Sequence, residues 1–433
     1  MPEARFTFNL RAGVLLLWVA AITFVFPIPH TIALRNVLLA GIALFVMAAF
    51  PPAPTSGPLG KLRQAGIVLL TLSGWLVVQG LVLSQTPLIV LERIRSDLAA
   101  PMLAAACGWW LTTRSRIPNV HRAVLVALAA HMIWVIGFQA LVRTHGGSWP
   151  GGRVPFADRD YQSSLNGFLI SLAVALALDS WITVGRDRLT RRGLLALAAL
   201  GADLLLRTRN GTVSSMIVSF AAMSVAIRLS TRRRAVLPLI VAGSAILIGL
   251  GALSVKADAR WRTLGESAAV GWTKAEGFFI LSREGSLTSI HDGPPVEESA
   301  FIRAALARLA IDAIIDSPLG VGYGHDAFGR TVPPRYGFPD MGGSSHSGIL
   351  DFTLGAGIPG LALLLLTAGL AIRGGWRQYR QHDDPAGLMF AFLVGGYLLR
   401  CLVDGHLSGW RLGLFAFICG VLIGSMKRES RPT

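Results

Sequence analysis

Long apolar segments recur along nearly the whole chain, separated by polar connections. Most are roughly 17 to 24 residues long, enough for a helix to cross the ~30 Å hydrocarbon core of a bilayer. The pattern predicts an all-α polytopic membrane protein with about twelve transmembrane helices. The twelve segments are residues 12–28, 33–50, 65–84, 97–113, 121–142, 165–184, 193–206, 211–228, 236–255, 347–372, 387–403 and 410–426.

The first segment could be a signal peptide or an uncleaved first helix. It follows Arg5 and Arg11, but no small-residue cleavage site comes after it. Residues 27–30 lead directly into the next apolar segment. We therefore expect an uncleaved transmembrane helix.

Basic residues gather in alternate connections, which sets the orientation of the chain. By the positive-inside rule, these connections and both termini lie in the cytoplasm. The formal net charge is +16, but the basic residues are scattered between spans, which argues against nucleic-acid binding. The basic connections are residues 61–63, 114–122, 186–192, 228–234 and 373–380, and the C-terminal tail adds residues 427–431.

One external connection is far longer than the others. Residues 256–346 separate the ninth and tenth segments, and loops of this length are usually functional. We divide the chain into residues 1–255 with nine spans, this large loop, and residues 347–433 with three spans and a cytoplasmic tail. Within the loop, apolar spacing predicts one helix over residues 299–316, with Ser299 as its N-cap and Pro318 just beyond its end.

Two shorter external features accompany this loop. Residues 86–98 mix aliphatic side chains with charged ones, which is typical of an interfacial amphipathic helix. Residues 143–166 form a polar and aromatic connection that contains Trp149, Tyr161 and Gln162.

Four residues on the external side are candidates for chemistry: Arg207, Arg209, Arg303 and His346. Arg207 and Arg209 interrupt two apolar segments with no acid beside them, and a guanidinium fork suits phosphate or pyrophosphate. Contact with lipid headgroups is the competing interpretation. For Arg303 taken alone, a solvated helix face is the favoured interpretation. His346 stands where the long loop enters a membrane span, and ionisable groups there are functional candidates. A histidine that only satisfies hydrogen bonds is the competing interpretation.

Other patterns carry less information. Residues 320–324 resemble a glycine-rich dinucleotide loop, but no strand precedes them, so we reject that interpretation. The pairs His325-Asp326 and Asp404/His406 lack a third ligand at metal-binding spacing, so no metal and no cofactor are expected. Residues spaced i, i+4 could simply form ion pairs. These are Asp203 with Arg207, and Arg400 with Asp404.

The arrangement resembles the O-antigen ligase and polymerase family of bacterial inner-membrane glycosyltransferases. Its external motif is His, then Asn, Ser or Gln, then nine residues and G-x-x-G, which matches His346-Ser347 and residues 357–360. A second family pattern places Arg fifteen residues before a Pro that opens a G-x-G turn, which Arg303 and Pro318 satisfy. The third, an Arg-Gly turn after span 7, is matched only in part, because Asn210 separates Arg209 from glycine.

The resemblance implies a GT-C-like fold and a periplasmic active site in the bacterial inner membrane. The donor would be a glycan linked to undecaprenyl pyrophosphate, and the acceptor a sugar hydroxyl of lipid A–core, with membrane lipids as surroundings. Arg209 and Arg303, together with Arg207, would hold the pyrophosphate, whose developing charge must be stabilised. His346 would act as general base in a metal-independent, inverting transfer.

Three alternatives stay open. An O-antigen polymerase would use the same donor but extend another lipid-linked chain. A protein O-oligosaccharyltransferase is related but is usually longer at its C-terminus. A twelve-helix transporter typically shows two similar halves with the long connection after span 6, whereas here it follows span 9. The single large external loop favours the ligase.

Overall fold

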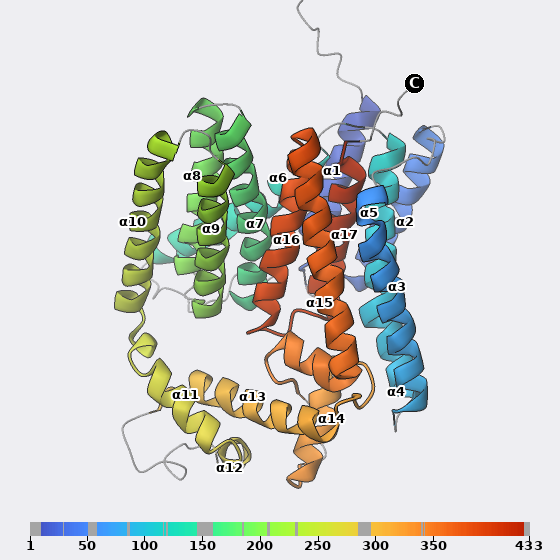
Figure 1. Ribbon diagram of the computed structural model, residues 1–433, viewed down its shortest axis with the longest axis vertical. Coiled ribbons are helices and arrows are strands. Elements are labelled where there is room, and N and C mark those ends of the chain that lie inside the picture. The colour runs from blue at the N-terminus through green and yellow to red at the C-terminus, as the bar shows by residue number, and fades with distance from the viewer. Residues whose placement is uncertain are drawn as a thin grey trace, which may run out of the picture.

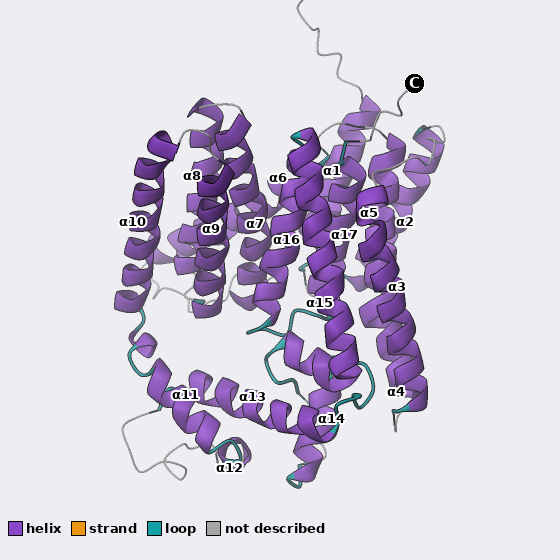
Figure 2. Cartoon of the chain, viewed as in Figure 1, coloured by secondary structure: helices purple, strands orange, loops and turns teal. Residues whose placement is uncertain are grey.

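The computed structural model is built of helices joined by loops, and no strand occurs in the part of the chain that it describes (Figure 2). All residues are described except 1–9, 29, 51–58, 85–86, 116, 118–119, 145–158, 184–185, 206–207, 230–232, 285–295, 339–340, 342 and 428–433.

For each of the twelve predicted apolar segments, most of the described residues lie in helix, which confirms the all-α membrane class. Within the described part of the chain, six helices are long and apolar enough to cross a membrane by length and composition, and four shorter helices are also apolar. The count of twelve crossings stays a prediction. The helices that contain the segments are α1 (Leu10–Val25), α2 (Ile32–Ala49), α3 (Leu59–Val82), α5 (Ala100–Ser115), α6 (His121–Thr144), α7 (Arg159–Thr183), α8 (Arg186–Leu205), α9 (Arg209–Leu229), α10 (Arg233–Ala257), α15 (Gly348–His382), α16 (Pro385–Cys401) and α17 (Gly409–Ser425).

The long connection folds into short helices at one end of the bundle. Figure 1 shows α11 to α14 lying together below the long helices, while the C-terminus lies at the opposite end. They enclose their own apolar core, in which Phe301, Leu309 and Phe328 are buried. The short helices are η2 (Ala259–Trp261), α11 (Leu264–Thr273), α12 (Gly277–Glu284), α13 (Glu298–Asp316) and α14 (Ala327–Arg335).

The predicted loop helix is present as α13, but its N-cap differs from the prediction. The helix begins at Glu298, and the Glu297 carboxylate accepts a hydrogen bond of 2.7 Å from the backbone N–H of Ala300. Ser299 is therefore not the cap. The reason is tertiary: the backbone N–H of Glu297 donates to the Ser267 hydroxyl of α11, which holds Glu297 at the helix start. The helix ends at Asp316, just before Pro318, as predicted.

The two shorter external features are confirmed only in part. The predicted connection 143–166 is too long, because α6 runs to Thr144 and α7 already begins at Arg159. Gln162 is consequently buried within α7, and Trp149 lies outside the described residues. The segment 86–98 forms α4 (Pro87–Ile94), which exposes Leu88 and buries Val90, and it continues into a π-helical turn, η1 (Arg95–Ala99).

The two glycine motifs interlock with each other. Helix α15 is broken at Gly357, whose φ of 76° and ψ of 172° lie outside the helical region. The break frees backbone groups on both sides, and the 318–322 turn satisfies them. Val321 donates to the Leu354 carbonyl, Gly322 donates to that of Gly355, and the N–H of Ile358 donates to the Pro318 carbonyl. The G-x-G and G-x-x-G motifs are thus two halves of one backbone junction.

We expect Gly357→Ala to lower the melting temperature of the purified protein by several degrees. A Cβ there would lie 2.4 Å from the carbonyl carbon of Leu319, and this φ/ψ combination is essentially restricted to glycine, so the cost is on the order of 1–3 kcal/mol. The control is Gly369→Ala on the same helix, where a Cβ meets no atom within 4 Å. Equal melting temperatures for the two variants in one detergent would contradict the interlock.

Candidate functional site

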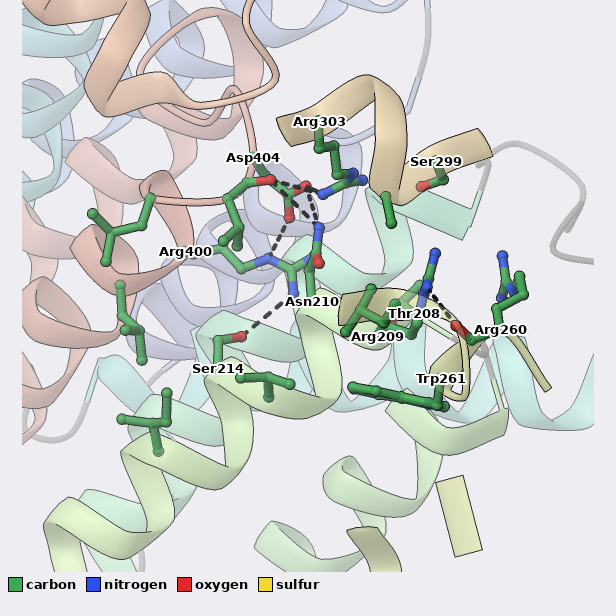
Figure 3. A pocket seen from close by; sticks show the side chains of 17 residues that line it. Thr208, Arg209, Asn210, Ser214, Arg260, Trp261, Ser299, Arg303, Arg400 and Asp404 are labelled. Carbon is green, nitrogen blue, oxygen red and sulfur yellow. Dashed lines mark hydrogen bonds and ion pairs between the residues drawn. The ribbon is translucent and has the colours of Figure 1, made fainter. Parts of the chain in front are cut away.

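A cavity of about 330 Å³ opens where the short helices meet the long bundle. Its walls come from the start of α9, from η2, from the first turns of α13, and from the end of α16 with the connection that follows (Figure 3). Arg209 and Arg303 both line it, although they are far apart in the sequence. The structure thus brings together two of the four candidate residues. Arg207 lies outside the described residues.

Arg209 is the first residue of α9 and is held by a carboxylate from the loop. Its Nη2 lies 2.9 Å from Oε1 of Glu297, and its Nη1 donates to the backbone carbonyl of Arg260 at 3.5 Å. The side chain is 12% exposed. The interpretation of Arg209 as an arginine without an acidic partner is therefore wrong: its partner lies 88 residues away and could not be seen in the local sequence.

Arg303 reaches across the cavity from α13. Its Nη1 donates to the Val403 carbonyl at 2.9 Å and lies 3.5 Å from Oδ1 of Asp404. Its side chain is 38% exposed, so one part of the guanidinium remains open to the cavity. Arg303 does not simply lie on a solvated helix face, because its side chain points toward Asp404 and into the cavity (Figure 3).

Asp404 is the point on which the polar side chains converge. Arg400 Nε lies 3.0 Å from Oδ2, which confirms the predicted i, i+4 pair, and Asn210 Nδ2 donates to Oδ1 at 3.1 Å. Arg400 is itself buried, and its Nη2 donates to the Ser163 hydroxyl of α7 at 2.7 Å. One carboxylate therefore ties α9, α13 and α16 together at the cavity wall.

A further arginine, Arg260 of η2, lines the same cavity. Its Nη2 lies 2.6 Å from Oδ2 of Asp258. Burial alone would raise the pKa of Asp258, but the hydrogen bonds and charge of Arg260 lower that pKa overall. The same hydrogen bond raises the pKa of Arg260. The cavity therefore carries four guanidinium groups, each in contact with at least one carboxylate, carbonyl or hydroxyl oxygen.

Part of the cavity wall is apolar. Val213 and Ile217 lie one turn apart on α9, and Leu399 and Leu402 come from the end of α16. Val213, Ile217 and Leu402 are exposed at the surface of the bundle. Exposed aliphatic side chains on the long apolar helices are expected to face lipid. The cavity wall therefore combines cationic groups with aliphatic groups that are open to the lipid.

His346 stands beside this cavity but is not among the residues that line it. It lies just before α15 with a φ of 57°, and its side chain is exposed. The turn is held by its neighbours, because the Asp351 carboxylate accepts from the N–H of Ser345 at 2.8 Å and the Ser347 hydroxyl accepts from that of Leu350. The turn that contains His346 is fixed to the cavity wall through the N–H of Gly348, which donates to the Asp404 carbonyl at 3.0 Å.

The other histidines of interest have structural partners. His325 Nδ1 lies 2.8 Å from Oδ2 of Asp97, and this hydrogen bond is the main cause of the raised pKa of His325. His406 is buried against the Ser164 hydroxyl at 2.9 Å, and burial, with Arg400 and Arg411 nearby, holds its pKa well below the usual range. Among the described residues, no three His, Cys, Asp or Glu side chains gather at metal-binding distance.

Arg260 and Arg400 were not predicted from the sequence to be part of a site. Arg400 carried a signal, since an ionisable side chain at the end of an apolar segment is a functional candidate, but its pairing with Asp404 explained it locally. Arg260 carried none, because it is one of several basic residues in the long connection.

Comparison with protein families identifies the central part of the chain. Residues 193–365 match the family described as O-antigen ligase. The matched range contains Arg209, Arg303 and His346, and it ends before Arg400 and Asp404. A comparison with curated proteins finds no match.

Proposed function

We propose that this member of the O-antigen ligase family transfers a glycan from undecaprenyl pyrophosphate to a sugar hydroxyl of lipid A–core. The reaction takes place at the periplasmic face of the bacterial inner membrane, on a GT-C-like fold. The observation that supports this most directly is the cavity, whose wall combines four arginines with exposed aliphatic side chains. A polyprenyl pyrophosphate has the same two parts, an anionic head and an apolar tail.

The arginines suit the leaving group of this reaction. Negative charge grows on the pyrophosphate as its bond to the sugar breaks, and donors placed in advance around that charge lower the barrier. Arg303 is the most exposed of the cavity arginines that carry a carboxylate contact, and Arg209 sits at the N-terminus of α9, where the helix dipole also favours an anion. Arg207 precedes this helix and is a further candidate for pyrophosphate binding.

His346 completes the reaction as general base. The acceptor hydroxyl oxygen attacks the anomeric carbon of the donor sugar, and the bond between that carbon and the pyrophosphate oxygen breaks. The imidazole takes the hydroxyl proton, and undecaprenyl pyrophosphate leaves with the bonding electron pair. A single displacement of this kind inverts the anomeric centre. In support of this role, the His346 side chain is exposed, so an acceptor can reach it from outside.

The proposed chemistry draws its positive charge from arginine side chains and requires no metal ion. Transfer by the purified protein is therefore expected to continue in the presence of a chelator of divalent cations. Strong inhibition by the chelator that is reversed by adding a divalent ion would contradict the metal-independent mechanism.

Products that accumulate in a deletion strain separate the ligase from its nearest alternative, an O-antigen polymerase. Without a ligase, long glycan should remain on undecaprenyl pyrophosphate, and lipid A–core should stay bare. Without a polymerase, lipid A–core should still carry a single repeat unit. Purified protein that joins lipid-linked glycan to lipid A–core with no other factor would support the ligase. Lipid A–core capped with one repeat in the deletion strain would overturn it.

A further inference from the structure

A second, smaller cavity lies on the other side of the His346 turn. It has a volume of about 90 Å³, the share of roughly three water molecules in the liquid. Ser344 and Gly348, which flank His346 in the sequence, both line it. His325 and Ser408 add polar groups, and the remaining wall includes aromatic side chains.

The two cavities are separated by the connection between α16 and α17. Asp404 lines the large cavity, and the next residue, Gly405, lines the small one. The N–H of Gly348 donates to the Asp404 carbonyl, so the His346 turn is fastened to this partition. His346 itself lines neither cavity, but two residues close to it in the sequence, Ser344 and Gly348, line the small one.

The walls of the small cavity are rigid and of mixed character. Tyr323 and Phe352 contact each other edge to face with ring centroids 6.0 Å apart, and the Tyr323 hydroxyl donates to the backbone carbonyl of Asp97. The buried Asp97 carboxylate, presented by the π-helical turn η1, fixes the half-exposed His325 ring. A pocket of aromatic rings, hydroxyl groups, one imidazole and the carboxylate of Asp351 is suited to a small polar ring that carries several hydroxyl groups.

We propose that this second cavity binds the acceptor sugar and delivers its hydroxyl to His346. The inference rests on the proposed function. In an inverting displacement the nucleophile approaches the anomeric carbon from the side opposite the leaving group. An acceptor ring held by one edge in the small cavity would present its outer hydroxyl groups beside the His346 turn, on a side away from the pyrophosphate that the arginines hold. The volume suits one edge of a single sugar ring, so the rest of the acceptor remains outside.

Gly405 offers a way to fill this cavity without straining the backbone. A Cβ at this position would meet only the Ser344 hydroxyl, at 3.9 Å. We expect Gly405→Val to raise the KM for lipid A–core about tenfold or more, since one sugar hydroxyl loses its hydrogen bonds, and to leave the KM for lipid-linked glycan unchanged. The matched control is Gly265→Val on α11, where a Cβ meets no atom within 4 Å, and both KM values should stay at the wild-type level.

A labelling experiment tests the cavity without relying on turnover, including the case in which Gly405→Val fails to fold. The hydroxyl of Ser344 can be replaced by a thiol of similar size in Ser344→Cys. Lipid A–core should slow the reaction of this thiol with a small water-soluble maleimide, whereas lipid-linked glycan should not. The wild-type protein, with Cys401 and Cys419 buried and Cys107 partly so, provides the labelling background.

The outcomes distinguish this inference from the proposed function. If wild-type protein transfers glycan but Gly405→Val keeps the wild-type KM for lipid A–core, the second-cavity assignment is overturned and the proposed function stands. Protection of Ser344→Cys by the donor instead of the acceptor would likewise overturn the second-cavity assignment. If the wild-type protein transfers no glycan to lipid A–core, the proposed function fails, and the inference built on it falls as well.

Discussion

His346→Ala is expected to lower the turnover number of glycan transfer by about 10²- to 10⁴-fold, the range associated with a general acid or base. The affinity for undecaprenyl-pyrophosphate-linked glycan should stay close to that of the wild-type protein, because His346 does not line the arginine cavity. Both quantities can be measured on one preparation, by direct binding of the lipid-linked donor and by the rate of transfer to lipid A–core.

The backbone at His346 calls for a second substitution as control. Its φ of 57° is tolerated by His and Asn better than by Ala, so His346→Ala combines the loss of the imidazole with backbone strain of about 1–2 kcal/mol. His346→Gly removes the imidazole and the strain together, and His346→Asn keeps a polar side chain that suits this conformation. All three variants should be equally inactive. Wild-type activity in His346→Gly would show that the position serves only the turn.

The sequence predicted those parts of the site that are encoded by local spacing. The interval from His346 to the 357–360 motif reflects one structural unit, in which a helix start is followed by a break in the same helix. The interval from Arg303 to Pro318 likewise spans the end of α13 and the turn that fills this break. Intervals of this kind can be recognised in the sequence because most of the chain between their ends is helix, which fixes the spacing.

The partners of the arginines could not be predicted in this way. Arg209 contacts Glu297 across 88 residues, and Arg303 of α13 contacts Asp404 in the connection between α16 and α17. No helical period links such positions, since they meet only when α9, α13 and α16 pack together. The same holds for the cap of α13: Ser299 has the residue type that local rules favour, but Glu297 is held in place by Ser267 of α11.

The extent of α7 was missed for a related reason. Polar residues near its start, such as Gln162 and Ser164, are typical of a loop, yet they are buried in the helix. Ser164 bonds His406, and its neighbour Ser163 bonds Arg400, so these hydroxyl groups satisfy side chains from the C-terminal part of the chain. The polar residues at the start of α7 therefore belong to an internal hydrogen-bond network behind the cavity.

Arg303→Ala and Arg209→Ala are each expected to lower kcat by about 10²-fold or more, the scale of losing one donor that stabilises charge in the transition state. Arg303→Lys and Arg209→Lys should recover activity only in part, since an ammonium group keeps the charge but loses the fork that can bind two phosphate oxygens. Donor affinity should fall along with kcat, in contrast to the His346 variants.

Arg308→Ala is the matched control for Arg303→Ala. Arg308 lies on the same helix, pairs with Asp312 at i, i+4, and is not among the residues that line the cavity. Exposed pairs of this kind contribute little to stability, so transfer should remain at the wild-type level.

Arg209→Ala needs a separate control, because it leaves the Glu297 carboxylate without its arginine in a partly buried position. Glu297 also caps α13, the helix that carries Arg303, so a loss of activity could come from a displaced helix. Arg209→Ala with Glu297→Gln removes both charges while an amide oxygen can still accept the cap hydrogen bond. If this double variant recovers wild-type kcat, Arg209 acts only through the ion pair. If it stays as inactive as Arg209→Ala with an unchanged melting temperature, the guanidinium itself is required.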